Sequence, residues 1–300
     1  MGKSIDLHMH SYYSDDGEYS PEELVQRCSD SGIRIMAIAD HNSVRANEAG
    51  EQAALRAGIT YIPAIEIDCT FREINLHVLG YGIDYRSGGF AEIEDRIAAQ
   101  GAEASRQMLL ATRELGFCIT REEMEELARD HYRKDRWTGE MFAEALLNKP
   151  EYRDHPLLRP YRPGGDRGDN PYVNFYWDYY SQGKCCYVRM EYPSLAQTAD
   201  VIHKNGGCAV LAHPGVNLRD REELLKPVLD EGIDGIEAFS SYHSPSQCMY
   251  FYHEAICSDR FFTCGSDYHG KTKPSIIIGG HGCAVSDEEV ICQLDKILPL

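Results

Sequence analysis

The sequence predicts an α/β fold in which helices alternate with strands of a largely parallel sheet, and in which a long helical segment interrupts the alternation. Up to Tyr81, short apolar runs alternate with segments that carry helix-capping signals. From about residue 90 to residue 183 the alternation stops, and helices and loops follow one another without a core strand. Several of the apolar runs end in His, Asp or Glu, which adds a chemical pattern to the structural one.

The first strand is expected at Ser4 to Ser11, where it carries His8 and His10. Side chains of a strand point alternately to its two faces, so these two imidazoles share one face. Two imidazoles placed in this way form half of a metal site if other ligands come from elsewhere in the chain. Two nearby histidines in a buried strand are also compatible with a purely structural, hydrogen-bonded role.

Helices and strands then alternate up to residue 81. The sequence predicts a helix from Ser20 to about Ser31, a strand at 33–39 followed by Asp40 and His41, a helix at 44–57, and strands at 60–67 and 74–81 that carry Glu66 and His77. The first helix begins with a typical capping sequence, Ser-Pro-Glu-Glu. Glu66 lies between apolar residues, and an unpaired buried carboxylate is costly, so we expect it to be protonated or bound to a cation.

Residues 90–183 are predicted to form a mainly helical insertion domain, while 1–89 and 184–300 form the main domain. Helices are expected at 90–115, from Thr120 onwards and near 139–147. Prolines and glycines between 150 and 171 accompany Arg153, Arg159, Arg162 and Arg167, a composition compatible with a solvated loop or with a lid over a substrate. The aromatic residues between 172 and 180 are expected to pack the insertion onto the main domain.

The second half of the main domain repeats the arrangement of apolar strands with polar ends. Residues 185–188 are compatible with a return to the sheet, and further strands are expected at 208–212, 233–239 and 261–264, with helices at 195–205, from Ser244 and from Ser286. The strands lead to His213, contain Glu237, and lead to Asp267 and His269. We expect a supporting, hydrogen-bonded carboxylate at Glu237 and a surface or capping role for His203.

The polar residues at the strand ends form one chemical set. In α/β barrels, functional groups gather at the C-terminal face of the strands, so residues distant in sequence can meet there. The set offers nitrogen and oxygen donors without thiolates, which suits zinc, manganese or iron. It is too large for one ion and suits two or three ions that share a bridging carboxylate. Its members are His8, His10, Asp15, Asp40, His41, Glu66, His77, His213, Asp267 and His269.

Composition narrows the possible partners. The chain has 300 residues and a formal net charge of −18, which repels long nucleic acids unless metal ions or a basic patch reverse the field. Neither a signal peptide nor a membrane-spanning stretch is evident, and eleven cysteines without a C-x-x-C pair indicate reduced thiols. We expect a cytoplasmic protein without a membrane partner. Its cysteines are expected to serve mainly in packing, with a thiolate metal site or a catalytic thiol as the alternative.

Together, these motifs resemble those of the PHP (polymerase and histidinol phosphatase) family, a branch of the amidohydrolase superfamily. The resemblance rests on His8-Met9-His10, Asp40-His41, Glu66, His77, Ala212-His213-Pro214-Gly215 and Gly265-Ser266-Asp267-Tyr268-His269, in this order. It covers nearly the whole chain outside the insertion and is similar to the stand-alone subgroup with an inserted helical domain. It implies a distorted, TIM-like (β/α)7 barrel with three divalent metal ions (Mn, Fe or Zn) on its C-terminal rim and the insertion covering the active site.

The resemblance also implies a role for each candidate residue. A first metal would be held by His8, His10, Glu66 and Asp267. Glu66 would bridge to a second metal, held also by His77 and His213, and a third metal would be held by Asp15, His41 and His269. Asp16 is the direct neighbour of Asp15. Asp40 is expected to orient a ligand rather than to bind a metal.

The implied function is a metal-dependent phosphoesterase that acts on small phosphate esters: nucleotide or sugar phosphates, bisphosphates or cyclic phosphodiesters. We expect a metal-bound hydroxide to attack the phosphorus atom while the metals neutralise the phosphate oxygens. Arg136 is the main candidate for binding an anionic group of the substrate, followed by Lys184 and Arg189. His243 is a candidate for substrate binding and for protonation of the leaving oxygen. For each of these four residues, the alternative is an exposed ion pair or a helix cap.

Three alternative functions are open at this point: a 3′-5′ exonuclease on short oligonucleotides, a histidinol-phosphate phosphatase, and a non-catalytic, metal-stabilised binding module. The acidic charge disfavours a long polymeric substrate. A binding module would be expected to have lost ligands, whereas the set is complete here, which favours an enzyme. The sequence makes no prediction of the oligomeric state.

Overall fold

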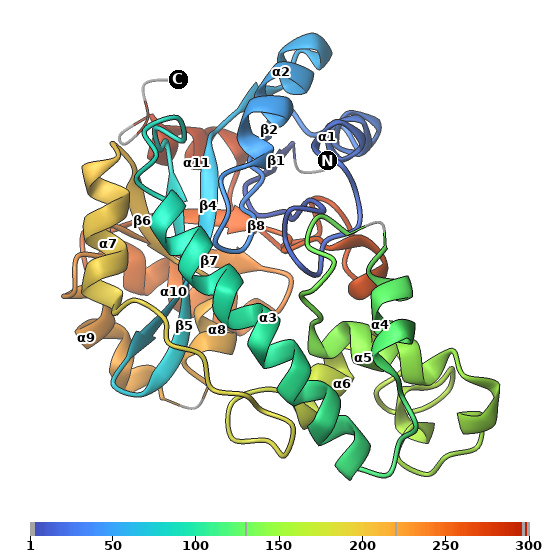
Figure 1. Ribbon diagram of the computed structural model, residues 1–300. Helices are drawn as coiled ribbons and strands as arrows, with labels where there is room; N and C mark the ends of the chain where they lie inside the picture. The colour runs from blue at the N-terminus through green and yellow to red at the C-terminus, as the bar shows by residue number, and fades with distance from the viewer. Residues whose placement is uncertain (1–3, 130, 220, 296–297, 299–300) are drawn as a thin grey trace.

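The computed structural model describes residues 4–129, 131–219, 221–295 and 298 (Figure 1). The ends of the predicted main domain, at 1–3 and 299–300, lie outside the described residues. The described strands form two sheets, one of three strands and one of five. The mixture of helices and strands confirms the predicted α/β class.

The smaller sheet is parallel, as predicted. It pairs β1 (Ile5–Asp6) with β2 (Ile35–Met36) and β2 with β3 (Thr60–Tyr61). The connecting helices are α1 (Pro21–Asp30) and α2 (Ala46–Ala57), and α1 begins with the predicted capping box at Ser20. The strands are shorter than predicted, although backbone hydrogen bonds between the same two segments continue beyond them, from Ala37 N–H to Asp6 O at 3.1 Å and from Ala39 N–H to Met9 O at 2.9 Å.

The larger sheet is mixed, which corrects the expectation of a parallel arrangement. Its order is β4 (Ala64–Phe71), β5 (Ile74–Tyr81), β6 (Cys208–Leu211), β7 (Gly235–Ser240) and β8 (Phe261–Gly265). The pairs β4–β5 and β5–β6 are antiparallel, and the other two are parallel. Between β4 and β5 the chain turns at Arg72 and Glu73, both with positive φ, in the tight hairpin geometry that only antiparallel strands need.

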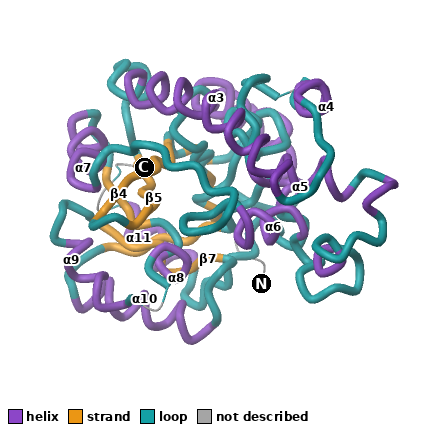
Figure 2. Tube along the Cα trace, turned by 60° about the horizontal axis from the view of Figure 1, so that its bottom comes forward, coloured by secondary structure: helices purple, strands orange, loops and turns teal. Residues whose placement is uncertain are grey.

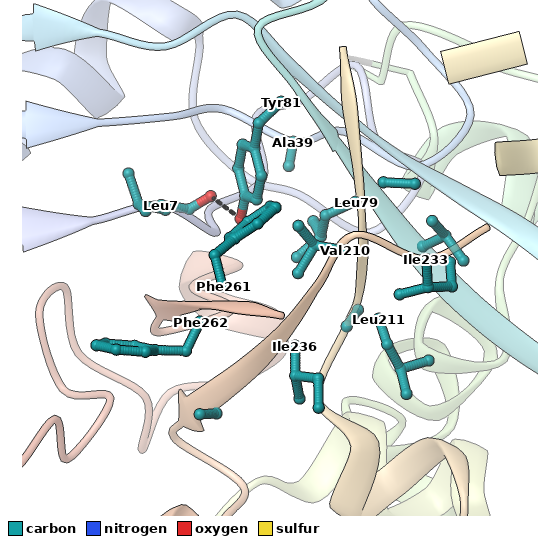
Figure 3. Packing of buried hydrophobic residues seen from close by; sticks show 14 of the residues in the cluster. Leu7, Ala39, Leu79, Tyr81, Val210, Leu211, Ile233, Ile236, Phe261 and Phe262 are labelled. Carbon is teal, nitrogen blue, oxygen red and sulfur yellow. Dashed lines mark hydrogen bonds between the residues drawn. The ribbon is translucent and has the colours of Figure 1, made fainter. Parts of the chain in front are cut away.

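Hydrogen bonds join the edges of the two sheets. Leu7 N–H donates to Cys264 O at 3.1 Å, which places the chain after β1 beside β8. Glu66 N–H donates to Asp40 O at 3.1 Å, which places the chain after β2 beside β4. In the core between the sheets, the hydroxyl of buried Tyr81 donates to Leu7 O at 2.9 Å (Figure 3). The strand ends at residues 8–10, 40–41 and 66 therefore lie side by side.

Further helices lie around the larger sheet (Figure 2). They are α7 (Leu195–Lys204), α8 (Pro214–Asn217), α9 (Leu225–Leu229), α10 (Pro245–Cys257) and α11 (Asp287–Leu294). Short 3₁₀ turns are present at 150–152, 159–161, 222–224 and 270–272. Residues 185–188 form a turn and irregular chain rather than a strand, so the sheet resumes only at β6.

The region between β5 and α7 is helical, as predicted. It contains α3 (Ala91–Glu114), α4 (Arg121–Leu127), α5 (Gly139–Leu147) and α6 (Pro171–Tyr179), and α3 runs from the sheets to the other three helices (Figure 1). Its buried side chains, including Phe142, Phe175 and Tyr180, form a hydrophobic cluster of their own. Phe175 and Tyr180 thus pack mainly within this region, whereas the sequence predicted contact with the main domain.

Candidate metal centre

The carboxylate of Glu66 lies at the middle of a cluster of imidazoles. Glu66 is completely buried in β4. Its Oε2 atom lies 3.2 Å from each of three histidine nitrogens, and its Oε1 atom lies 3.1 Å and 3.2 Å from two others. The three nitrogens are His8 Nε2, His10 Nε2 and His41 Nδ1, and the two are His77 Nδ1 and His213 Nε2. Each oxygen of one carboxylate therefore faces a different subset of five imidazoles.

Asp267, which follows β8, is the second carboxylate of the cluster. Its Oδ1 atom lies 3.2 Å from His8 Nε2 and 3.0 Å from His10 Nε2. Its Oδ2 atom accepts hydrogen bonds at 2.6 Å from the Tyr242 hydroxyl and from the Lys273 ammonium group. One oxygen is thus held by the protein, and the other faces the imidazoles.

Burial and nearby positive charge shift the pKa values of these two carboxylates in opposite directions. Burial by itself would raise the pKa of Glu66, but the nearby His8, His41 and His77 hold that pKa well below its ordinary value. The pKa of Asp267 is likewise held well below its ordinary value, against the effect of burial, with Lys273 as the strongest favourable charge. Both groups are therefore held as carboxylates rather than as neutral acids.

Three overlapping groups of side chains have ligand atoms close enough to share one ion each. One group is His8, Glu66, His213 and Asp267, the second is His41, Glu66 and His77, and the third is His10, Asp16, His41 and His269. Eight of the nine predicted ligands occur in these groups, but the grouping differs from the one that the resemblance implied. His213 lies with His8, and His10 lies with His41 and His269, although His10 Nε2 is also 3.2 Å from Glu66.

The two neighbouring aspartates of the first loop point to different partners. Asp16 Oδ2 lies 3.2 Å from His269 Nε2, whereas Asp15 forms an ion pair with Arg136. The loop is held by Gly17, where a Cβ atom would lie 2.0 Å from Ser11 O. The structure therefore brings Asp16, rather than the predicted Asp15, into the group with His41 and His269.

Glu237 and Asp40 hold histidines and their surroundings through hydrogen bonds. Glu237 Oε1 accepts from His8 Nδ1 at 2.9 Å, and its Oε2 accepts from the backbone N–H of His213 at 2.7 Å. Asp40 accepts from the Ser14 hydroxyl at 3.2 Å, and Ser14 Oγ in turn lies 2.9 Å from His10 Nδ1. These bonds leave the Nε2 atoms of both histidines facing the cluster, which is how outer groups commonly orient metal ligands.

Sequence reasoning missed several polar residues of the site, among them Asp68, Tyr242 and Lys273 beside the cluster. Asp68 Oδ1 lies 3.1 Å from His77 Nε2, and Asp68 Oδ2 accepts from Asn42 at 2.7 Å. Asp68 was identifiable, since residues two apart on a strand share a face and Glu66 is on the same strand. Tyr242 and Lys273 lie in irregular segments, where the sequence carries no comparable signal.

The donor set fits divalent metal ions. Four buried polar atoms of the cluster have no hydrogen-bond partner among the described residues: His41 Nδ1, His213 Nδ1, His269 Nε2 and Asp16 Oδ1. Two of them, His41 Nδ1 and His269 Nε2, lie 3.2 Å from a carboxylate oxygen but in a direction unsuitable for a hydrogen bond. Buried polar groups are normally paired, so unpaired ones gathered at one place fit a site that binds cations. Nitrogen and carboxylate oxygen donors suit Zn, Mn or Fe.

Two residues of the cluster have unusual backbone conformations. His213 has a φ of 22° and Asp267 a φ of 57°, values that non-glycine residues seldom adopt. Such conformations persist where the surrounding structure enforces them, often at functional sites. Each residue lies two positions after the end of a strand, β6 for His213 and β8 for Asp267, where the chain turns at the cluster.

A cavity of about 330 Å³ opens over the cluster. It is lined by His41, His77, His213 and Asp267 on the side of the sheets and by Arg136, Glu140, Tyr176 and Trp177 from the helical region. Arg219, Arg221 and Lys273 also line it, and the Arg219 guanidinium lies 4.4 Å from the centre of the Trp177 ring. The cavity thus combines a wall of imidazoles and carboxylates with cationic and aromatic side chains.

The four residues that the sequence offered for substrate binding have different surroundings. Arg136 lines the cavity. Lys184 and Arg189 are exposed and do not line it. Both ring nitrogens of His243 are engaged by the backbone: Nδ1 donates to Ala238 O, and Nε2 accepts from Gly215 N–H, each at 3.0 Å. These bonds leave His243 without a nitrogen for a substrate.

Two further polar groups lie outside the cluster. His203 pairs with Asp234 at 2.6 Å near the surface, in line with its expected surface role. Cys264, His281 and Cys283 are buried together. His281 Nε2 already donates to Ile5 O, and its Nδ1 accepts from Cys283 N–H. The imidazole of this group is therefore used by the backbone, which disfavours the alternative of a thiolate metal site.

Comparison with known proteins identifies the family. Residues 6–156 match the PHP domain. Among curated proteins, the chain is 27% identical over 279 residues to the 3′,5′-nucleoside bisphosphate phosphatase of Chromobacterium violaceum, covering 89% of this chain and 87% of that protein. It is 26% identical over 268 residues to the phosphoribosyl 1,2-cyclic phosphate 1,2-diphosphodiesterase of Eggerthella lenta, covering 89% and 94%.

Two more similarities are informative. The chain is 26% identical over 272 residues to a 5′-3′ exoribonuclease of Haemophilus influenzae, covering 90% of this chain and 91% of that protein. The solved structure of an amidohydrolase from Chromobacterium violaceum with bound sulfate matches the fold with a TM-score of 0.77, at 24% identity and with 97% of each chain covered.

Two predictions of the sequence can be assessed at this point. Among the described helices, none combines the length and the apolar character that crossing a bilayer requires. The expected enzyme class agrees with the family and with the relatives, all three of which cleave phosphate esters. The chain belongs to the PHP domain family, and it is a metal-dependent phosphoesterase.

Proposed function

We propose that this enzyme hydrolyses small phosphate esters at a centre of three divalent metal ions, Mn, Fe or Zn. The observation that carries the proposal is the position of Glu66, whose two oxygens each face a different subset of five imidazoles. A carboxylate in this position suits a bridge between ions. The proposed ligands are His8, His10, Asp16, His41, Glu66, His77, His213, Asp267 and His269.

When bound, divalent ions would neutralise phosphate oxygens and lower the pKa of a coordinated water. The chain's own residues would hold and orient the reactants. Glu237 fixes the ring of His8, and Asp40 acts on His10 through Ser14. Arg136 would bind an anionic group of the substrate from the helical side of the cavity, while Lys273 keeps Asp267 ionised and in place. We do not assign proton transfer to His243, because the backbone occupies both of its ring nitrogens.

We also propose that the two sheets form one distorted, seven-stranded barrel, in which β3 and β4, separated by two residues and both beside the β2 segment, count as one interrupted strand. The hydrogen bonds between residues 7 and 264 and between residues 66 and 40 support this arrangement. The separate hydrophobic cluster of the helical region supports 90–183 as an inserted domain, with 1–89 and 184–300 as the barrel domain. The contribution of Arg136, Glu140 and Trp177 to the cavity supports its position over the active site.

The size of the cavity favours a compact substrate. A volume of about 330 Å³ is at the lower end of the range for small-molecule sites. Nucleotide bisphosphates and cyclic phosphodiesters, the substrates named for two relatives, are therefore the first compounds to examine. A second candidate function is exonucleolytic cleavage of short oligonucleotides, and the relevant relative is named for the 5′-3′ direction, opposite to the 3′-5′ direction considered from the sequence.

The experiment is an assay of the metal-loaded enzyme against monophosphates, 3′,5′-bisphosphates, cyclic phosphates and short oligonucleotides. Release of phosphate and formation of intermediate esters are followed separately. The proposal predicts turnover of at least one small phosphate ester well above that of the oligonucleotides. Preferred cleavage of oligonucleotides from the 5′ end would favour the second candidate, and no turnover of any ester by metal-loaded protein would contradict both.

A further inference from the structure

We propose that Asp15 is a positioning residue for Arg136, and that helix α3 holds Arg136 at the cavity through Gly101 and Ser105. The inference rests on the proposed role of Arg136 in binding the anionic group of the substrate. It assigns different tasks to two neighbouring carboxylates: Asp16 belongs to the proposed metal centre, and Asp15 holds the arginine that faces it.

The ion pair connects the main domain to the helical region. Asp15 lies in the loop after β1, and Arg136 lies in the segment before α5. Both side chains are mostly buried, with 16% and 15% of their surface exposed, and both line the cavity. A charge pair of this kind is screened less than one in water. Asp15 therefore restrains the guanidinium beside the metal ligands.

Gly101 provides the space through which Arg136 passes. This glycine is buried in the middle of the 24-residue helix α3, where glycine costs roughly 0.5–1 kcal/mol relative to alanine. A Cβ atom at residue 101 would lie 2.5 Å from Arg136 Nε and 3.2 Å from Arg136 Cδ and Cζ. The glycine thus costs helix stability, and in return the arginine can cross the helix close to its backbone.

Ser105, one turn further along α3, fixes the backbone next to Arg136. Its hydroxyl accepts a hydrogen bond from Trp137 N–H at 2.7 Å and donates to Gly101 O at 2.8 Å. Residues four apart on a helix lie on one face, so Gly101 and Ser105 form a single docking face for residues 136–137. The side chain and the backbone at Arg136 are therefore held at separate points, as expected for a pre-organised binding group.

The test measures the affinity of metal-loaded protein for inorganic phosphate by calorimetry, together with metal content. The variants are Asp15→Asn, Gly101→Ala, Arg136→Ala, and each of the first two combined with Arg136→Ala. Asp16→Asn tests the neighbouring carboxylate. Glu103→Ala, on the exposed side of α3, is the matched control.

We expect Asp15→Asn and Gly101→Ala each to weaken phosphate binding about 5- to 10-fold, with metal content unchanged, while Asp16→Asn loses metal. In the Arg136→Ala background, neither substitution should weaken binding further, because both act through the arginine. Glu103→Ala should bind phosphate normally. Wherever turnover is measurable, the loss should appear in KM rather than kcat.

Two results would overturn the inference: metal loss in Asp15→Asn equal to that in Asp16→Asn, or effects that add fully to that of Arg136→Ala. If Asp15→Asn does not fold, the inference is tested by Gly101→Ala and by its combination with Arg136→Ala. Phosphate binding does not depend on turnover, so absence of phosphoesterase activity would contradict the proposed function while leaving this test intact. Wild-type protein that is metal-loaded but does not bind phosphate would contradict the role of Arg136 itself.

Discussion

The Nε2 atom of His8 lies 3.2 Å from the Oε2 atom of Glu66, and both side chains are completely buried. His8 Nδ1 is already bonded to Glu237, so only Nε2 faces the cluster. The same carboxylate faces four further imidazoles, so it connects residues from β4, β5 and the ends of three other strands. This arrangement makes Glu66 the residue on which the proposed metal centre depends most.

Glu66→Ala should abolish turnover, by more than about 100-fold, and should lower the metal content, because the shared carboxylate is lost. The variant should remain folded but be less stable, because the buried imidazoles around residue 66 lose their shared carboxylate partner. Activity, elemental analysis and circular dichroism check these three points. Near-normal phosphoesterase rates would contradict the bridging role.

Glu237→Gln tests how the ligands are oriented. The substitution keeps the shape of the side chain but weakens its bonds to His8 Nδ1 and His213 N–H. We expect metal affinity to fall roughly 10- to 100-fold, with the enzyme still active at saturating metal. Titration of metal-free protein with manganese while activity is followed gives the affinity, and an unchanged curve would show that Glu237 does not act on these ligands.

Arg136→Ala should raise KM for a phosphate ester about 10-fold or more while leaving metal content unchanged, because the side chain lines the cavity and belongs to none of the metal groups. Arg189→Ala provides the control, since Arg189 is exposed and does not line the cavity. Steady-state kinetics of both variants with the best substrate should show the raised KM in Arg136→Ala and a normal KM in Arg189→Ala. Equal kinetics for Arg136→Ala and wild type would leave Arg136 with a structural role only.

Glu140 should make the metal-free protein less stable as the pH rises. Burial, reinforced by the nearby Asp16, raises the pKa of this carboxyl from 4.5 to about 7. Between these values the unfolded chain releases the proton while the folded protein keeps it, so stability falls as pH increases through that range. The penalty is roughly 3 kcal/mol at most.

Glu140→Gln removes this titration. The variant should match wild type near pH 4.5 and exceed its stability at pH 8, as measured by urea denaturation of protein stripped of metal. A difference between the two proteins that does not change with pH would show that Glu140 titrates normally.

Local signals in the sequence were sufficient for the helices but not for the sheet. Capping is decided within four residues, and Ser20, Thr120, Ser194 and Ser244 all begin helices with capping boxes where the sequence places helix starts. The β4–β5 hairpin was missed because its turn residues, Arg72 and Glu73, are not the Asn-Gly or Gly types that announce such a turn. An antiparallel pair was therefore taken for two parallel strands.

In the candidate site, too, the residues placed by local sequence signals could be predicted, whereas those placed by loop geometry or distant contacts could not. The histidines and Glu66 follow or occupy apolar strands, so periodicity and position were enough to identify them. The choice between Asp15 and Asp16 depends on how the loop turns at Gly17, and a one-residue difference there reverses the partners. The role of His243 depends on Gly215, which is distant in sequence and brings its N–H to the imidazole.

The most direct test of the account is the metal content of the purified protein after reconstitution with Mn, Fe or Zn and removal of loosely bound ions. Nitrogen and oxygen ligands in three overlapping groups predict about two to three ions per chain. A folded protein that retains no metal after reconstitution with any of the three would contradict the proposed centre and the chemistry derived from it.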